Sequence, residues 1–344
     1  MKYDKKRIDL DNQTLPNILN KLYYHHIEVR IAATFETNLE AWVGAILRNN
    51  LMYAAKQIYV MENVSLQEQI DRCSLDENHP MYKDLIDGFP KGYLIALPDT
   101  YSNELRLNKG ELLCFSIYLI GKMDTFYREF IQAIRLMCQR GIGHPMVPFT
   151  LVDICEKSLE GRIHLLSLGS DDLDDTLVYP ISYWDFHTIY THLKKTHIEI
   201  NYITPVMLFK HTIKKDTSVS FQDKSNGFPS FYQLIRSTIA RMVKLTILYI
   251  NPAETDISDL TMDALSDWID YATNLTLIAV DMQKKTLKNT PKKEVDNKMP
   301  LCGYVGNQKF EGDFNRYLPM LKFMEALGVG SETVYGMGRF RIKV

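Results

Sequence analysis

The sequence has few cysteines and no cysteine pattern that would hold a metal ion or a disulfide framework. Its five cysteines, an odd number, are spread along the chain, and none forms a Cys-x-x-Cys pair. A structural zinc site and a disulfide scaffold are therefore both unexpected, which is typical of a protein from a reducing compartment. We accordingly expect a cytoplasmic protein that needs no metal and no cofactor.

The sequence also has no long apolar run and no dominant charge of one sign. Its longest apolar stretch, Leu112–Ile120, is far shorter than the ~20 residues of a membrane-spanning helix, and the polar start MKYDKKRIDLDNQ does not resemble a signal peptide. Lysine and arginine together number 40 against 42 acidic residues, so the formal net charge is −2. We expect no membrane partner, and nucleic-acid binding would need a local basic surface.

What the sequence does contain is two successive runs of strand and helix patterns. Its 344 residues suit two domains of roughly 150 each, and a hydrophobic content of 46% is enough for a buried core. In the first half, β-branched runs and helical spacing of apolar residues predict a βαββαβ order. The elements are strand Ile27–Phe35, helix Leu39–Gln57, strands Tyr93–Leu97 and Leu112–Ile120, a helix from an Asp124 N-cap to Arg140, and strand Phe149–Ile154.

The second half repeats this order. Its predicted elements are strand His197–Phe209, helix Phe228–Tyr249, strands Leu275–Met282 and Leu301–Val305, helix Asp313–Leu327, and strand Phe340–Val344. The order βαββαβ is typical of the ferredoxin-like fold. We therefore predict an α+β protein made of tandem ferredoxin-like (RRM-like) domains, each with an antiparallel sheet. The N-terminal domain would span 1–193, with an insertion near 62–91, and the C-terminal domain 194–344.

The C-terminal segment LGVGSETVYGMGRFRIKV is the most informative part of the sequence, because glycines are concentrated there between a helix and a strand. Glycines allow close backbone approach, and the exposed amides of such a loop can hold phosphate oxygens. Two arginines follow at strand spacing, which predicts that both point to one face, toward a nucleic-acid backbone. The residues concerned are Gly328, Gly330, Gly336, Gly338, Arg339 and Arg341. The alternative is a helix cap and a tight turn with solvated arginines.

The segment GVGSETVYGMGRFRI resembles the glycine-rich loop that defines the RAMP superfamily of CRISPR-associated proteins. Other segments resemble its pre-crRNA-processing endoribonuclease family, in the same order along the chain. These are AWVGAILRNNLMYAA for the first helix, LIG and GIGHPMVPFTL around the second helix, IEINYITPVML for the first strand of the second domain, and CGYVGNQKFEGDFNRYLPMLKFMEAL before the loop. The resemblance implies tandem ferredoxin-like domains, binding of CRISPR repeat RNA (pre-crRNA), and one metal-independent cut within it.

In that family, the ribose 2′-hydroxyl attacks the adjacent phosphate and leaves a 2′,3′-cyclic phosphate and a 5′-hydroxyl. A histidine on or near the first helix usually serves the reaction, often with a tyrosine or lysine. This chain departs from the pattern, because no histidine lies between Ile27 and Asn78. The candidate catalytic residues are therefore Tyr53 and Lys56, which share a helical face, and His144, which follows Gly141-Ile142-Gly143. Arg48 is a candidate for RNA binding.

The segment 283–298, QKKTLKNTPKKEVDNK, holds the largest local basic excess of the sequence. It could follow an RNA backbone, or it could be a solvated loop. Its candidate RNA-binding residues are Lys284, Lys285, Lys288, Lys292 and Lys293. Near the first strand, His25 and His26 are adjacent, and because side chains alternate along a strand, one of the two could be exposed for that reason alone.

Three functions remain open on the sequence. The first is the endoribonuclease. The second is a non-catalytic RNA-binding subunit of a CRISPR effector complex, which the missing first-helix histidine favours. The third is a ferredoxin-like enzyme acting on a small molecule, which has no phosphate loop or nucleophile motif to support it. The expected partners are pre-crRNA and other CRISPR-associated proteins, with the chain a monomer or a homodimer.

Overall fold

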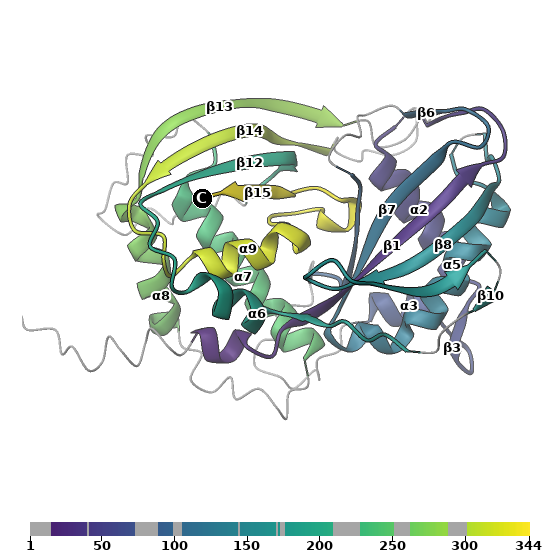
Figure 1. Ribbon diagram of the computed structural model, residues 1–344, viewed down its shortest axis with the longest axis horizontal. Coiled ribbons are helices and arrows are strands. Elements are labelled where there is room, and N and C mark those ends of the chain that lie inside the picture. Colours follow the sequence, from purple (N-terminus) through teal and green to yellow (C-terminus); the bar gives the residue numbers. More distant parts are fainter. Residues whose placement is uncertain are drawn as a thin grey trace, which may run out of the picture.

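The computed structural model describes residues 15–39, 41–72, 89–98, 105–143, 145–169, 171–172, 176–208, 228–250, 262–287 and 301–344. Their two main antiparallel sheets lie side by side, one in each half of the chain (Figure 1), and two small two-stranded sheets, β2-β6 and β3-β4, accompany the first. Among these residues, no helix is both long and apolar enough to cross a membrane.

The first half contains a seven-stranded sheet with the strand order β10-β9-β8-β1-β7-β5, and β11 pairs with the start of β1. Its core is the order β8-β1-β7-β5, which is the fourth-first-third-second order of a ferredoxin-like fold. The strands are β1 Tyr23–Ala33, β5 Tyr93–Ala96, β7 Leu112–Ile120, β8 Phe149–Lys157, β9 Ile163–Leu168, β10 Asp171–Asp172 and β11 Ile181–Ser182.

Two helices cover one face of this sheet and leave the other face open. They are α2 Val43–Ala55 and α5 Tyr127–Arg140, which contact each other behind the sheet as seen in Figure 1. The predicted N-cap of the second helix is wrong: Asp124 lies inside a 3-10 turn, Gly121–Phe126, and α5 begins after Phe126 without a side-chain cap. Smaller elements are β2 Thr37–Leu39, β3 Tyr59–Met61, β4 Val64–Ser65, α3 Leu66–Asp71, β6 Leu105–Leu107 and α6 Tyr183–Tyr190.

The second half contains a four-stranded sheet with the order β13-β14-β12-β15, again the ferredoxin-like order of second, third, first and fourth strand. The strands are β12 His197–Val206, β13 Thr276–Leu287, β14 Leu301–Glu311 and β15 Phe340–Lys343. The helices are α7 Phe231–Tyr249, α8 Met262–Tyr271 and α9 Leu318–Leu327, with 3-10 turns η3 Ala272–Asn274 and η4 Thr333–Tyr335. The predicted fold class, α+β with tandem ferredoxin-like halves, is confirmed.

Several predicted element bounds differ from the structure for physical reasons. The helix predicted from Asp313 begins at Leu318, because Pro319 is tolerated only in the first helical turn. The helix predicted from Phe228 begins at Phe231, where Ser230 and Gln233 form a reciprocal capping box. Strand β13 continues five residues beyond the predicted Met282, because an edge strand accommodates lysines without burying them.

The two halves share one hydrophobic core. Phe323 on α9 of the second half is fully buried among aromatic rings of the first half. Its ring centroid lies 5.3 Å from that of Tyr24, 5.6 Å from that of Phe186 and 5.9 Å from that of Tyr183. Tyr249 on α7 adds a polar link by donating a hydrogen bond of 3.1 Å to the carbonyl of Pro90. We call the surface where the halves meet the seam.

Candidate functional site

The glycine-rich loop after α9 is packed into the seam. Its four glycines all have left-handed backbone angles, which non-glycine residues seldom adopt. A Cβ atom on Gly338 would overlap the carbonyl oxygen of Val329, and one on Gly336 would lie 2.9 Å from the carbonyl oxygen of Ile95 on β5. The glycines at these two positions therefore let backbone pack on backbone.

The loop amides are largely used inside the protein, which corrects the expectation that they face a phosphate. Gly338 donates to the carbonyl of Pro205 at 2.9 Å, and Gly336 to that of Thr333 at 2.9 Å. Gly328 donates to Met324 at 2.8 Å as the cap of α9, and Ser331 donates to Met207 at 3.2 Å. In this geometry Gly328, Gly330, Gly336 and Gly338 shape the loop, and at least three of their amides have protein acceptors.

The two arginines after the loop differ in exposure, so the expectation that both face a nucleic-acid backbone does not hold for Arg339. Arg339 precedes β15 and is only 5% exposed, with its guanidinium donating to the carbonyl of Leu97 in the first half. Arg341 lies within β15 opposite Asn201, and its side chain is 41% exposed. Its guanidinium lies 3.9 Å from the Glu325 carboxylate. Arg339 therefore links the halves, while Arg341 remains accessible to a ligand.

The first helix contacts the loop through its beginning and its middle. Trp42, just before α2, donates from Nε1 to the carbonyl oxygen of Tyr335 at 2.6 Å. The guanidinium carbon of Arg48 lies 5.2 Å from the centre of the Tyr335 ring, a cation–π geometry. Of the residues predicted on the first helix, Arg48 is thus the one that the structure brings to the loop.

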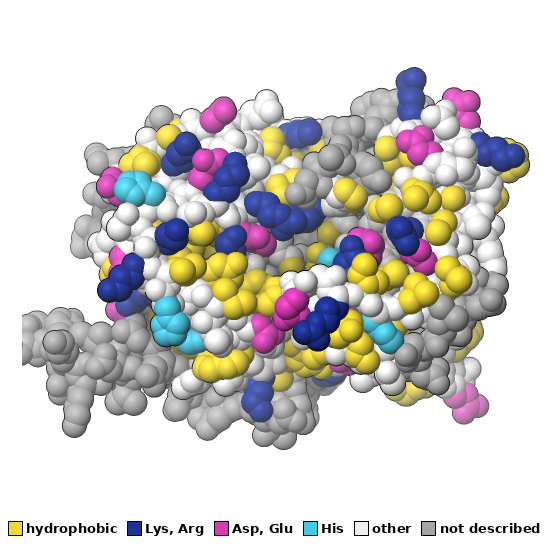
Figure 2. Space-filling view, viewed as in Figure 1, with side chains coloured by type: hydrophobic (Ala, Val, Ile, Leu, Met, Phe, Trp, Pro, Cys, Tyr) yellow, Lys and Arg dark blue, Asp and Glu magenta, His cyan; other side chains and the backbone are white. Residues whose placement is uncertain are grey.

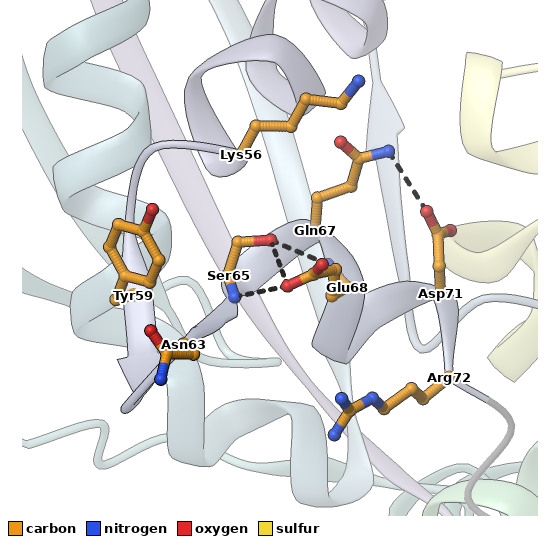
Figure 3. Close-up of a pocket in the computed structure, with 8 residues that line it drawn as sticks. All are labelled: Lys56, Tyr59, Asn63, Ser65, Gln67, Glu68, Asp71 and Arg72. Atoms are coloured by element: carbon orange, nitrogen blue, oxygen red, sulfur yellow. Dashed lines mark hydrogen bonds between the residues drawn. The ribbon is translucent and has the colours of Figure 1, made fainter.

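The predicted catalytic residues are not assembled by these contacts. Tyr53 is half exposed and faces α5, where the Arg140 guanidinium lies 4.1 Å from its ring centre. Lys56, at the end of α2, lines an open hollow with residues of the β3–β4 hairpin and α3 (Figure 3). The described partners of Tyr53 and Lys56 come from the first half alone. His144 lies outside the described residues.

The hollow beside Lys56 is polar and is built around a helix cap. Ser65 caps α3 by accepting from the amide of Glu68 at 3.2 Å, and the Glu68 carboxylate accepts from the Ser65 amide at 2.8 Å. Figure 3 shows these two side chains turned toward each other at the centre of the lining residues. Because Ser65 and Glu68 satisfy each other's polar groups, the helix cap accounts for the polar side chains at the centre of the hollow.

Only part of the predicted basic segment falls within the described residues. Lys284 and Lys285 lie on β13 opposite Tyr304 and Gly303, and both are exposed. The prediction of a loop there was wrong, since these two lysines stand on an edge strand. Lys288, Lys292 and Lys293 lie outside the described residues.

The adjacent histidines of β1 face opposite sides of its sheet. His25 points to the helix side and is buried, with Nδ1 at 2.6 Å from the Glu156 carboxylate and Nε2 at 3.6 Å from that of Asp124. Burial lowers the pKa of His25, but hydrogen bonds to Asp124 and Glu156 outweigh it, so the net pKa is raised. His25 is therefore part of a buried ion-pair cluster.

His26 points to the open side of the sheet, at the seam. Its Nε2 lies 2.9 Å from the hydroxyl of Ser116, and its ring stacks on Tyr118 with centroids 4.7 Å apart. Burial lowers the pKa of His26 to about 4, assisted by the positive charges of Lys157, Arg339 and Arg341. The imidazole is therefore neutral at pH 7. Sequence reasoning noted the strand alternation but had no means of pairing His26 with partners on β7 and β15.

Cations outnumber acids where His26 meets the second half. Lys157 pairs with Glu28 at 2.5 Å, and Lys322 pairs with Glu325 at 2.9 Å. The charged groups that act on His26 are the cations Lys157, Arg339 and Arg341 and the acid Glu28. Figure 2 shows Lys and Arg side chains over the junction of the halves. A chain of net charge −2 thus carries a local positive excess at the seam.

Comparison with protein families finds one match in each half of the chain. Residues 21–174 match the AF_1859_N family, described as an N-terminal domain. Residues 191–340 match the family of the CRISPR-associated endoribonuclease Cas6. The C-terminal half of the chain is thus similar in sequence to Cas6. No curated protein matches the sequence.

Solved structures show that the Cas6-like fold extends over nearly the whole chain. A Thermus thermophilus Cas6 in a product complex shares 12% identity, with a TM-score of 0.51 over 93% of this chain and 99% of that chain. A chain of a partial Cas6-RT-Cas1–Cas2 complex shares 11% identity, with a TM-score of 0.57 over 95% of this chain and 47% of that one. This chain thus spans about half the length of the second relative.

Proposed function

We propose that the chain binds CRISPR repeat RNA (pre-crRNA) and cuts it once without a metal ion. The observation that carries this proposal is the match to the Cas6 family over residues 191–340. In the reaction, a ribose 2′-oxygen forms a bond to the adjacent phosphorus and the bond from phosphorus to the 5′-oxygen breaks. The products carry a 2′,3′-cyclic phosphate and a 5′-hydroxyl.

The proposed RNA path follows the seam, where a polyanion meets the local positive excess. Arg341 and Lys157 are the cations acting on His26 whose side chains also reach solvent, at 41% and 27% exposed. Lys284 and Lys285 could extend the path along β13. A guanidinium can hold a phosphate by two parallel hydrogen bonds, so Arg341 is the stronger candidate for the scissile phosphate.

Cleavage needs a base for the 2′-hydroxyl, an acid for the leaving oxygen and a cation for the developing charge. Tyr53, Lys56 and His144 remain the candidates that the sequence supplies for proton transfer. Arg48 and Arg341 are the candidates for stabilising the negative charge that develops on the phosphate. Supporting roles fall to Arg339 and the loop glycines, which hold the surface on which the RNA would lie.

The test is a cleavage assay in EDTA with a labelled repeat RNA and a matched RNA that carries a single 2′-deoxy substitution at the cut site. The proposal expects one cut in the ribose substrate, none in the deoxy substrate, and equal binding of both. Binding without cleavage would instead support a non-catalytic CRISPR RNA-binding subunit, which the absence of a first-helix histidine favours. Cleavage of the deoxy substrate would overturn the mechanism.

A further inference from the structure

His26 is fixed in a way that suits a group that moves a proton. The hydrogen bond to Ser116 fixes one ring nitrogen, and stacking on Tyr118 fixes the plane of the ring. Within the described part of the chain, Nδ1 has no hydrogen-bond partner and is not among the fully buried polar atoms. One ring nitrogen is therefore held by the sheet and the other is left for a ligand.

The surroundings of His26 fit a phosphodiester. The positive charges that act on it come from both halves: Lys157 on β8, and Arg339 and Arg341 at β15. Glu28, on the same strand face, is already paired with Lys157 at 2.5 Å. A phosphate group held by Arg341 would therefore sit beside a neutral imidazole, with its negative charge matched by a cation.

We infer that His26 is the general base that takes the 2′-hydroxyl proton in the cleavage step. The inference rests on the proposed function and assigns a residue that the family pattern would place on the first helix. The required tautomer has Nε2–H donating to the Ser116 hydroxyl, which leaves the lone pair of Nδ1 to accept the proton.

The step balances as follows. Nδ1 of His26 accepts the 2′-proton while the 2′-oxygen bonds to phosphorus and the 5′-oxygen departs with its electron pair, to be protonated by an acid or by water. Burial is the main cause of the lowered pKa of His26, and nearby cations lower it further; a bound phosphate counters the part that is due to the cations. The imidazolium formed is then stabilised by the negative phosphorane.

The experiment compares His26→Ala with His197→Ala as a matched control. His197 lies at the exposed start of β12, with a side chain 62% exposed and Nε2 3.5 Å from the Glu311 carboxylate. Single-turnover cleavage of the repeat RNA by His26→Ala should be slower by about 10²-fold or more, the range for loss of a general base. Affinity for the 2′-deoxy RNA should be unchanged, and added imidazole should restore part of the rate.

A substrate with a 5′-thio leaving group separates a base from an acid, because the thiolate departs without protonation. The defect of His26→Ala should persist with this substrate if His26 is the base. A defect that disappears would make it the acid and overturn the assignment. Loss of deoxy-RNA binding by the variant, or loss of its folded circular dichroism spectrum without rescue by His26→Asn, would likewise reject it in favour of a binding or structural role.

Failure of this inference is distinguishable from failure of the proposed function. If the wild-type protein does not cut repeat RNA, the proposed function fails. If the wild type cuts and His26→Ala cuts equally fast, only the assignment of His26 fails, and Tyr53, Lys56 and His144 become the next candidates.

Discussion

At the scale of single residues, His25 and His26 show how much a strand pattern can predict. Alternation along β1 indicates that the two side chains face opposite sides, and they do. Their partners are contributed by distant segments: Ser116 by β7 and Glu156 by β8. A single sequence carries no signal for these pairings, so it could not decide which histidine is a buried ion-pair member and which one reaches the seam.

The buried cluster of His25 predicts a pH effect on stability. Because the pKa of His25 is raised on folding, its contribution is fully present below its ordinary value of 6.5 and is lost as the pH rises through the folded value. His25→Ala should lower the free energy of unfolding by about 3 kcal/mol at pH 6, since the buried Glu156 carboxylate loses its cationic partner and keeps only the amides of Val178 and Tyr179. Urea titrations from pH 6 to 9 should show that the difference in free energy of unfolding between wild type and variant becomes smaller. A difference that stays constant with pH would contradict the ion pair.

Ser116 provides a second prediction at this scale, because it positions His26 without touching the reacting atoms. Ser116→Ala should slow single-turnover cleavage by about fivefold while leaving affinity for deoxy RNA unchanged, as expected when an orienting hydrogen bond of about 1 kcal/mol is lost. Ser116→Thr retains the hydroxyl and should recover most of the rate. Equal rates for all three proteins would mean that this hydrogen bond has no part in cleavage.

At the scale of elements, the sequence of the glycine-rich loop predicted its backbone conformation correctly but did not predict what the loop packs against. The density of glycine signals positive φ and close approach, and both are observed. The sequence does not say what approaches: here it is the backbone of β5 and of the segment after α9, against Gly336 and Gly338. A ligand-binding loop and a tightly packed one need the same residue type, so composition cannot separate them.

The loop therefore yields a stability prediction. Gly338→Val should cost about 3 kcal/mol, since a side chain there overlaps Val329 at a left-handed backbone angle. The matched control is Gly110→Ala, where φ is +83° and nothing lies within 4 Å of the added Cβ, so only the backbone cost of about 1 kcal/mol applies. Thermal denaturation measures both. Equal losses would show that the loop is not closely packed.

At the scale of the whole molecule, charge is arranged locally rather than globally. The net charge of −2 predicts no general affinity for RNA, whereas the seam gathers cations from both halves. Element order along the chain predicted both ferredoxin-like sheets, because periodicity and turns are local. How the sheets meet depends on contacts such as Phe323 with Tyr24, which no local pattern encodes.

Salt dependence tests the seam as the RNA path. Arg341→Ala should reduce the slope of log binding constant against log salt concentration by about 1, as expected for one lost phosphate contact. Arg162→Ala is the control, because Arg162 is exposed in the turn between β8 and β9. If Arg341→Ala leaves the slope unchanged, or if both substitutions reduce it equally, the RNA does not bind along the seam.

The insertion of Phe323 among the rings of Tyr24, Tyr183 and Phe186 has a consequence for evolution by duplication. Two copies of one fold that bury each other's aromatic side chains no longer fold independently. Cutting the chain between them would expose an apolar surface on each fragment. The two fragments should aggregate or reassociate. In the intact chain, the same buried contacts fix the distance between the two open sheets.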